Sequence, residues 1–136
     1  MILDGRLVAC NSFDFGTVSD APSVYEVMRV MEGIPLFLED HLARLENSMK
    51  YLCSDFRISP RDVARQIRQL SEGNQIRTGN VKIICTCKVK EKHPEHTRIL
   101  VSFIPHHYPT AAEYMQGITM RSLEMERPNP NAKFIN

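Results

Sequence analysis

The sequence predicts an α+β domain in which a largely antiparallel sheet carries two main helices on one face. Three observations predict it. The 136 residues suffice for one domain. Strand-like segments stand in pairs around turn signals, and strands joined in this way run antiparallel. Two amphipathic helical segments follow one another in the middle of the chain.

The first two strand pairs precede the helices. Residues 1–10 predict a short strand pair around an Asp-Gly turn. Residues 11–23 are polar and irregular, which is typical of a loop. The apolar, β-branched segment 24–30 then turns through Met-Glu-Gly into a second strand at 34–38.

The first helix is predicted by an apolar stripe at helical spacing, which consists of Leu38, Leu42, Leu45, Met49 and Leu52. Asp40 and Arg44 are four residues apart and are expected to pair on its other face. The second helix should begin at Ser59, a capping residue followed by proline, with Asp62 at the positive end. Gly73 stands where a left-handed C-terminal cap is expected.

Four further elements complete the predicted domain. Apolar and polar residues alternate over 81–89, which indicates a half-buried strand. Residues 99–104 return as its partner. Residues 110–116 form a short helix closed by a glycine, and 118–125 form a last strand.

Composition narrows the classes of function. The net charge of +1 gives no reason to expect nucleic acid as a partner. No apolar run approaches the roughly 18 residues of a membrane span, and no signal peptide follows Met1, so we expect no membrane partner and a cytoplasmic location.

Metal and disulfide chemistry are not expected. Cys85 and Cys87 share one face of a strand and are predicted to be small buried residues, because a second pair at zinc-ligand spacing is missing. The other candidate ligands are loop histidines without a supporting carboxylate pattern, namely His93, His96, His106 and His107.

One ordered pattern carries a resemblance. It consists of Tyr25 and Glu26 on a strand, the turn residue Gly33, a helix with His-Leu-Ala-Arg-Leu at 41–45, and then Ser48. It resembles the N-terminal domain of class IV aminotransferases, the fold type IV pyridoxal-phosphate enzymes. That family includes branched-chain aminotransferases, D-amino acid transaminases and aminodeoxychorismate lyases. The order of strands and helices also agrees, so the resemblance covers nearly the whole chain.

The resemblance implies that pyridoxal 5'-phosphate is the cofactor and assigns two residues to it. Arg44 matches the arginine that holds the phosphate, as suits a planar, permanently charged guanidinium. Lys133 matches the catalytic lysine that forms the Schiff base, and we expect burial or a nearby positive charge to favour its neutral amine. Taken alone, Arg44 could be a surface residue paired with Asp40, and Lys133 a solvated lysine.

The resemblance also suggests substrate-binding residues. Tyr25 matches an aromatic position that faces cofactor and substrate, although a surface strand tyrosine has the same pattern. Arg29 shares the strand face of Tyr25 and could pair with a carboxylate or be solvated. His41 is interpreted as a structural hydrogen-bonding residue.

The activity implied is amino transfer between an amino acid and a 2-keto acid, in a homodimer. Residues 1–125 would be the N-terminal domain and 126–136 an interdomain segment, with the C-terminal domain missing. The Arg-x-His and Tyr-x-Arg motifs of two subfamilies are absent, so the substrate stays open. Two alternatives remain: a pyruvate-eliminating aminodeoxychorismate lyase, and a non-catalytic binding or dimerisation domain.

Overall fold

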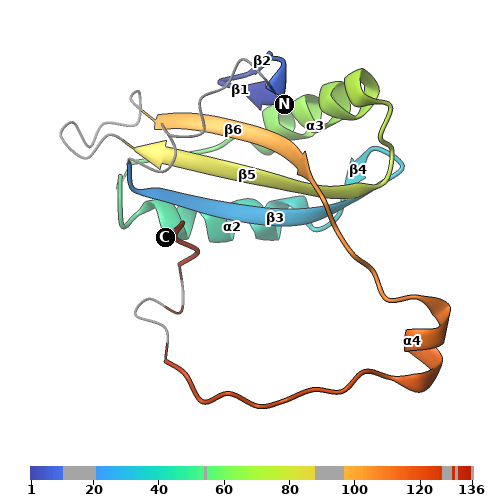
Figure 1. Cartoon of the computed structure of the whole chain (residues 1–136). Helices are drawn as coiled ribbons and strands as arrows, with labels where there is room; N and C mark the ends of the chain where they lie inside the picture. The colour runs from blue at the N-terminus through green and yellow to red at the C-terminus, as the bar shows by residue number, and fades with distance from the viewer. Residues whose placement is uncertain (11–20, 54, 88–96, 127–129, 131, 136) are drawn as a thin grey trace.

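Six strands form one sheet in the order β2-β1-β6-β5-β3-β4, and every neighbouring pair is antiparallel (Figure 1). The computed structural model describes residues 1–10, 21–53, 55–87, 97–126, 130 and 132–135. The strands are β1 (Ile2–Leu3), β2 (Arg6–Leu7), β3 (Ser23–Met31), β4 (Ile34–Pro35), β5 (Gly79–Cys87) and β6 (Thr97–Ile104). The helices are α2 (Leu38–Met49), α3 (Pro60–Asn74) and α4 (Ala111–Gln116).

The two long helices cover one face of the sheet, as predicted (Figure 1). Their apolar stripes pack in one core with alternate residues of the central strands, including Met28, Val81, Ile83 and Val101. The intervening residues of β3 and β5 lie on the opposite side, which we call the outer face. A smaller cluster of Met1, Ile84 and Leu100 is buried there. The α+β architecture is therefore confirmed.

The predicted start of the second helix is also confirmed. The hydroxyl of Ser59 accepts a hydrogen bond from the Asp62 backbone N–H, and Pro60 is the first helical residue. The end of this helix differs from the prediction. It runs past Gly73, and Gln75 takes the left-handed conformation with φ of 56°. A Cβ on Gly73 would lie 3.3 Å from Leu7 Cδ2, so this glycine lies where β2 approaches the helix.

Residues 118–125 do not form the predicted strand. Their apolar side chains are largely exposed, with Ile118 at 66% and Met120 at 82%. With α4, this segment lies away from the sheet (Figure 1). Alternation of apolar and polar residues indicates which side of an extended segment is apolar, but it does not show that a neighbouring strand exists. An extended segment becomes a β-strand only when its backbone groups form hydrogen bonds with such a neighbour.

Other boundaries are shorter than predicted. The second strand of the β3–β4 hairpin is limited to Ile34–Pro35, because Phe37 adopts a left-handed conformation with φ of 52° directly before α2. The first helix ends at Met49. Cys85 and Cys87 are buried, as predicted. His93 and His96 lie outside the described residues.

Candidate functional site

The end of the chain returns to the edge of β3 near its N-terminus (Figure 1). Phe134 forms an antiparallel bridge with Val24. The backbone carbonyl of Lys133 accepts a hydrogen bond from the Tyr25 N–H at 2.9 Å, and the Ile135 N–H donates to the Ser23 carbonyl at 2.9 Å. These backbone bonds bring Lys133 next to residues more than one hundred positions earlier in the sequence.

Ser48 links the same segment to α2. Its side chain is buried, and its hydroxyl donates to the Arg44 carbonyl one helical turn earlier. The backbone N–H of Lys133 lies 3.5 Å from the same hydroxyl oxygen. The serine of the sequence pattern therefore places the Lys133 backbone against the helix that carries Arg44.

Glu26 is the charged centre of the site. Its side chain has no exposed surface and points to the helix-covered side of the sheet. One oxygen, Oε1, accepts from Lys133 Nζ at 2.7 Å and from the Val27 N–H at 2.9 Å. The other, Oε2, accepts from Arg44 Nε at 2.5 Å. A buried carboxylate is stable only with such partners.

These partners decide the charge of Glu26. Burial by itself raises the pKa of a carboxyl group, but hydrogen bonds from Arg44, Lys133 and the Val27 N–H outweigh it and lower the pKa of Glu26 to about 2. The same contact raises the pKa of Arg44 above its ordinary value. Glu26 is therefore a carboxylate and Arg44 a guanidinium at neutral pH.

The contact of Arg44 corrects one prediction. Its ion pair is with Glu26 on the neighbouring strand, although Asp40 stands four residues earlier on the same helix. A fully buried carboxylate offers a stronger, less hydrated partner than an exposed one. Arg44 Nη2 also lies 3.1 Å from His41 Nδ1, and this ring nitrogen is 3.6 Å from Glu26 Oε1. His41 thus makes the hydrogen bond expected of it.

The surroundings of Lys133 also differ from the expectation. The expectation was a buried amine or an amine beside a positive charge. The Lys133 side chain is instead 33% exposed, and it forms an ion pair with a carboxylate. Arg44 supplies a nearby positive charge, but Glu26 stands between the two cations and binds both. The structure therefore brings the two predicted cofactor residues together through Glu26, which the sequence pattern included but to which it gave no role.

A pocket of about 890 Å³ opens beside these residues. It is lined by Asp40, Ala43, Arg44, Asn47, Lys50, Tyr51, Pro130 and Lys133. Three of the lining side chains are cations and one is an acid. The Arg44 side chain is 49% exposed here, so part of its guanidinium is accessible from the pocket. An anion with several oxygens suits this charge balance.

The lining residues that the sequence analysis missed include three with polar side chains on or just after α2, namely Asn47, Lys50 and Tyr51. Asn47 and Tyr51 follow Arg44 by three and seven residues, so helical spacing alone places them on the same side as Arg44. Lys50 donates to Asn47 Oδ1 at 2.7 Å. Glu26 had a different signal: it is the one acid among the inward positions of β3, where Val24, Met28 and Val30 are apolar.

Tyr25 and Arg29 lie on the outer face, as their spacing predicted. Lys133 Nζ lies 5.8 Å from the centroid of the Tyr25 ring, so the structure brings Tyr25 to the site. Arg29 is four residues further along β3. Its guanidinium stacks on Tyr108 at 3.8 Å from the ring centroid.

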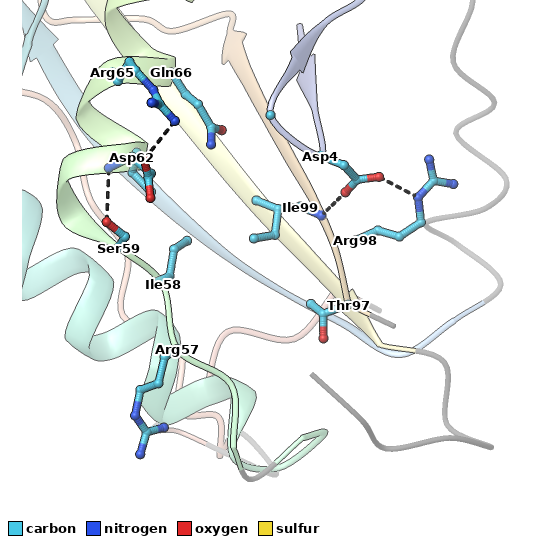
Figure 2. A pocket seen from close by; sticks show the side chains of 12 residues that line it. Asp4, Arg57, Ile58, Ser59, Asp62, Arg65, Gln66, Thr97, Arg98 and Ile99 are labelled. Atoms are coloured by element: carbon cyan, nitrogen blue, oxygen red, sulfur yellow. Dashed lines mark hydrogen bonds and ion pairs between the residues drawn. The ribbon is translucent and has the colours of Figure 1, made fainter. Parts of the chain in front are cut away.

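A second cavity, of about 710 Å³, lies between the start of α3 and the β1–β6 edge (Figure 2). Both of its acids are already paired with arginines, and Arg57 donates to the Phe56 backbone carbonyl. Asp4 contacts Arg98 at 3.3 Å and accepts from the Ile99 N–H, while Asp62 contacts Arg65 at 2.8 Å. These contacts stabilise the β1–β2 turn and the start of α3. The pocket beside Lys133 is therefore the stronger candidate for a binding site.

The described part of the chain gives no sign of a metal centre or a membrane span. It contains no cluster of three or more histidine, cysteine, aspartate or glutamate side chains able to hold a metal ion. His106 stacks against Tyr108, and His107 lies 4.0 Å from Glu113. None of the helices described is long and apolar enough to cross a bilayer.

Several known proteins resemble this chain in sequence or in fold. The family model for class IV amino-transferases matches residues 23–136. The chain is 32% identical over 60 residues to an aminodeoxychorismate lyase of Bacillus subtilis (strain 168), covering 44% of the chain and 20% of that protein. It is 35% identical over 71 residues to a D-alanine aminotransferase of Bacillus licheniformis, covering 52% of the chain and 25% of that protein.

A solved structure supports the fold. The branched-chain amino acid aminotransferase of Escherichia coli superposes with a TM-score of 0.61 at 17% identity, over 82% of this chain and 41% of that one. The chain thus spans less than half the length of each of these three proteins. The family match over residues 23–136, together with this fold, shows that the chain belongs to the class IV aminotransferase family, whose cofactor is pyridoxal 5'-phosphate.

Proposed function

We propose that this chain is the N-terminal domain of a pyridoxal-phosphate-dependent aminotransferase that moves an amino group between an amino acid and a 2-keto acid. The observation that carries the proposal is the shared carboxylate: Arg44 and Lys133 both bind Glu26 at the wall of one pocket. The phosphate group and the aldehyde of pyridoxal 5'-phosphate are carried by neighbouring ring carbons, and a guanidinium and an amine close together suit this pair of groups.

The pocket fits the cofactor in charge and chemistry. Arg44 would hold the phosphate with the part of its guanidinium that Glu26 does not bind, and Lys50 adds a second cation. Lys133 Nζ would hold the cofactor through its aldehyde carbon. When bound, the cofactor ring accepts the electron pair left at the substrate Cα. As a free amine beside that carbon, Lys133 Nζ would move its proton.

Tyr25 and Arg29 would contact the substrate from the outer face. Tyr25 lies beside Lys133, so its ring forms a wall next to the reacting amine. Arg29 offers a guanidinium to a carboxylate. We also propose the domain division at residue 125, with 126–136 as an interdomain segment, and a homodimer, both on the family resemblance.

The test is covalent trapping. The longest product of the native coding region is incubated with pyridoxal 5'-phosphate, reduced with borohydride and digested, and the modified peptide is mapped by mass spectrometry. A pyridoxyl group on Lys133 is expected, and a Lys133→Ala variant is expected to lack it. Label that is absent from Lys133 in the wild type would overturn the proposal and favour a non-catalytic binding or dimerisation domain.

A second candidate function is the lyase reaction, in which the same lysine and cofactor eliminate pyruvate. Its support is the 32% identity to an aminodeoxychorismate lyase, close to the 35% identity to an aminotransferase. Keto-acid formation measured with and without an added amino acceptor separates the two. An aminotransferase requires the acceptor for turnover, and a lyase does not.

A further inference from the structure

The second cavity, between the start of α3 and the β1–β6 edge, contains buried polar atoms that its ion pairs leave unmatched. In the part of the chain that the structure describes, three side-chain atoms are buried without a hydrogen-bond partner. Two of them, Gln66 Oε1 and Thr97 Oγ1, belong to residues that line this cavity. None of its described lining residues also lines the pocket beside Lys133, and β5 separates β6 from β3 in the sheet. The cavity is therefore a separate place in the fold.

The two unmatched atoms come from elements that face each other across the cavity. The Gln66 side chain projects from α3 into the space between this helix and β6 (Figure 2). Thr97 begins β6, and its hydroxyl lies near the thiol of Cys87, which is only a weak hydrogen-bonding group. A buried acceptor without a donor is unfavourable. A ligand that brings an N–H or O–H group to Gln66 Oε1 would therefore gain a hydrogen bond without displacing a protein partner.

The middle of the cavity is apolar. Ile58 and Val63 belong to the main core and its margin, and Ile99 of β6 packs against the same core. In Figure 2 Ile58 and Ile99 lie between Gln66 at one end and Arg57 at the other. An apolar body of a ligand would be favoured in this middle part.

Positive charge is in excess at the end opposite Gln66. Three arginines and two aspartates line the cavity, and each aspartate is paired with one arginine. Arg57 is the third arginine, and within the described ranges it has no carboxylate partner. Its Nη1 donates to the Phe56 carbonyl at 2.7 Å, and its side chain is exposed, so the rest of its guanidinium is available. This end suits a carboxylate.

We propose that this cavity binds a small organic acid with an apolar body and a hydroxyl or amino group at the end opposite its carboxylate. Arg57 would bind the carboxylate, the apolar middle would cover the body, and Gln66 Oε1 would accept from the hydroxyl or amino group. The volume of about 710 Å³ is in the range of small-molecule sites, about 300–1,000 Å³. The inference goes beyond the proposed function and does not depend on it, because the cofactor residues lie in the other pocket.

The test compares para-hydroxyphenylpropionate with phenylpropionate, which has the same carboxylate and body but no hydroxyl. Binding to the full native product is measured by titration calorimetry, with and without saturating pyridoxal 5'-phosphate. Gln66→Met keeps the unbranched length of the side chain and removes an amide whose oxygen has no partner, so it should not destabilise the fold. Gln69→Met makes the same change at an exposed position of the same helix. Arg57→Met removes the carboxylate partner, and Arg61→Met removes a charge from the exposed face of α3.

The wild type and Gln69→Met are expected to bind para-hydroxyphenylpropionate about fivefold more tightly than phenylpropionate, the effect of one hydrogen bond. Gln66→Met should bind the two acids within about twofold of each other. Arg57→Met should bind both acids about tenfold more weakly, whereas Arg61→Met should bind them as the wild type does. Saturation with pyridoxal 5'-phosphate should leave these affinities unchanged.

Four results would overturn the site. The first is a wild type that binds neither acid or shows no preference, and the second is a preference that survives in Gln66→Met. The third is an equal loss of affinity in Arg57→Met and Arg61→Met, because net charge would then explain it. The fourth is binding that pyridoxal 5'-phosphate abolishes, because the acid would then occupy the pocket beside Lys133. None of these results bears on the adduct at Lys133, so the proposed function is judged separately.

Discussion

The side-chain nitrogen of Lys133 lies 2.7 Å from Oε1 of Glu26, a carboxylate with no exposed surface. The second oxygen of Glu26 binds Arg44. One strand residue therefore fixes two cations that come from a helix and from the far end of the sequence. Anything that discharges or removes this carboxylate should affect the stability of the domain and the charge of the pocket together.

The first prediction concerns pH. Glu26 has a folded-state pKa of about 2 against an ordinary value of 4.5, so its contribution to stability is complete above pH 4.5 and is lost as the pH falls toward 2. The contribution at neutral pH should be about 3 kcal/mol. In urea unfolding at a series of pH values, the wild type should lose this stability below pH 4.5, whereas Glu26→Gln should show a much flatter profile.

An exposed acid provides the control for this profile. Glu39 stands in the first turn of α2 and is exposed, so Glu39→Gln should keep the wild-type dependence on pH. If Glu26→Gln and the wild type lost stability in parallel, the Glu26 carboxylate would not be the group that titrates.

The second prediction concerns two glycines. Gly73 is inside α3, and a Cβ there would meet only the side chain of Leu7, which is 58% exposed and free to shift. Gly73→Ala should therefore stabilise the domain by about 0.5–1 kcal/mol through helix propensity. Gly33 has φ of 78°, so Gly33→Ala should destabilise it by about 1 kcal/mol or more. Urea midpoints measure both, and a stabilising Gly33→Ala would contradict the assigned turn.

Much of the fold could be predicted from the sequence because its signals are local. The apolar stripe of α2 and the serine-proline start of α3 identified both helices. A β-branched run identified β3, alternation identified β5, and β6 followed as its returning partner. The prediction failed where the structure of a segment depends on a neighbouring strand. The segment 118–125 alternates like a strand, yet the described structure gives it no partner in the sheet.

The candidate site was predicted in part, for a related reason. The family pattern identified Arg44 and Lys133 individually, and the structure brings both into one pocket. The carboxylate that joins them was missed, because the contact of Glu26 with Lys133 spans 107 residues of sequence and no spacing rule reaches that far. The sequence carried two signals for Glu26, its place in the family pattern beside Tyr25 and an acid at an inward strand position, but neither one names its partners.

The third prediction concerns the Tyr25 ring. Because Lys82 and Lys133 both lie over this ring, Tyr25→Phe should keep the cation–π contacts and Tyr25→Leu should lose them. Each contact is worth about 0.5–1 kcal/mol at partly exposed sites, so Tyr25→Leu should lower the free energy of unfolding by about 1–2 kcal/mol more than Tyr25→Phe. Equal effects of the two variants would show that the ring does not hold the lysines.

The last prediction separates the phosphate contact from the other contacts of the cofactor. Arg44→Lys keeps the positive charge but loses the planar, two-pronged donor and the Nε bond to Glu26. Pyridoxal 5'-phosphate should bind the variant about 10- to 100-fold more weakly, which corresponds to the loss of one or two charged hydrogen bonds. Pyridoxal, which has the same aldehyde but no phosphate, should bind wild type and variant almost equally. Absorbance titration gives both affinities, with Arg65→Lys as the control outside the pocket. Parallel losses for both ligands would mean that Arg44 supports the pocket as a whole instead of binding the phosphate.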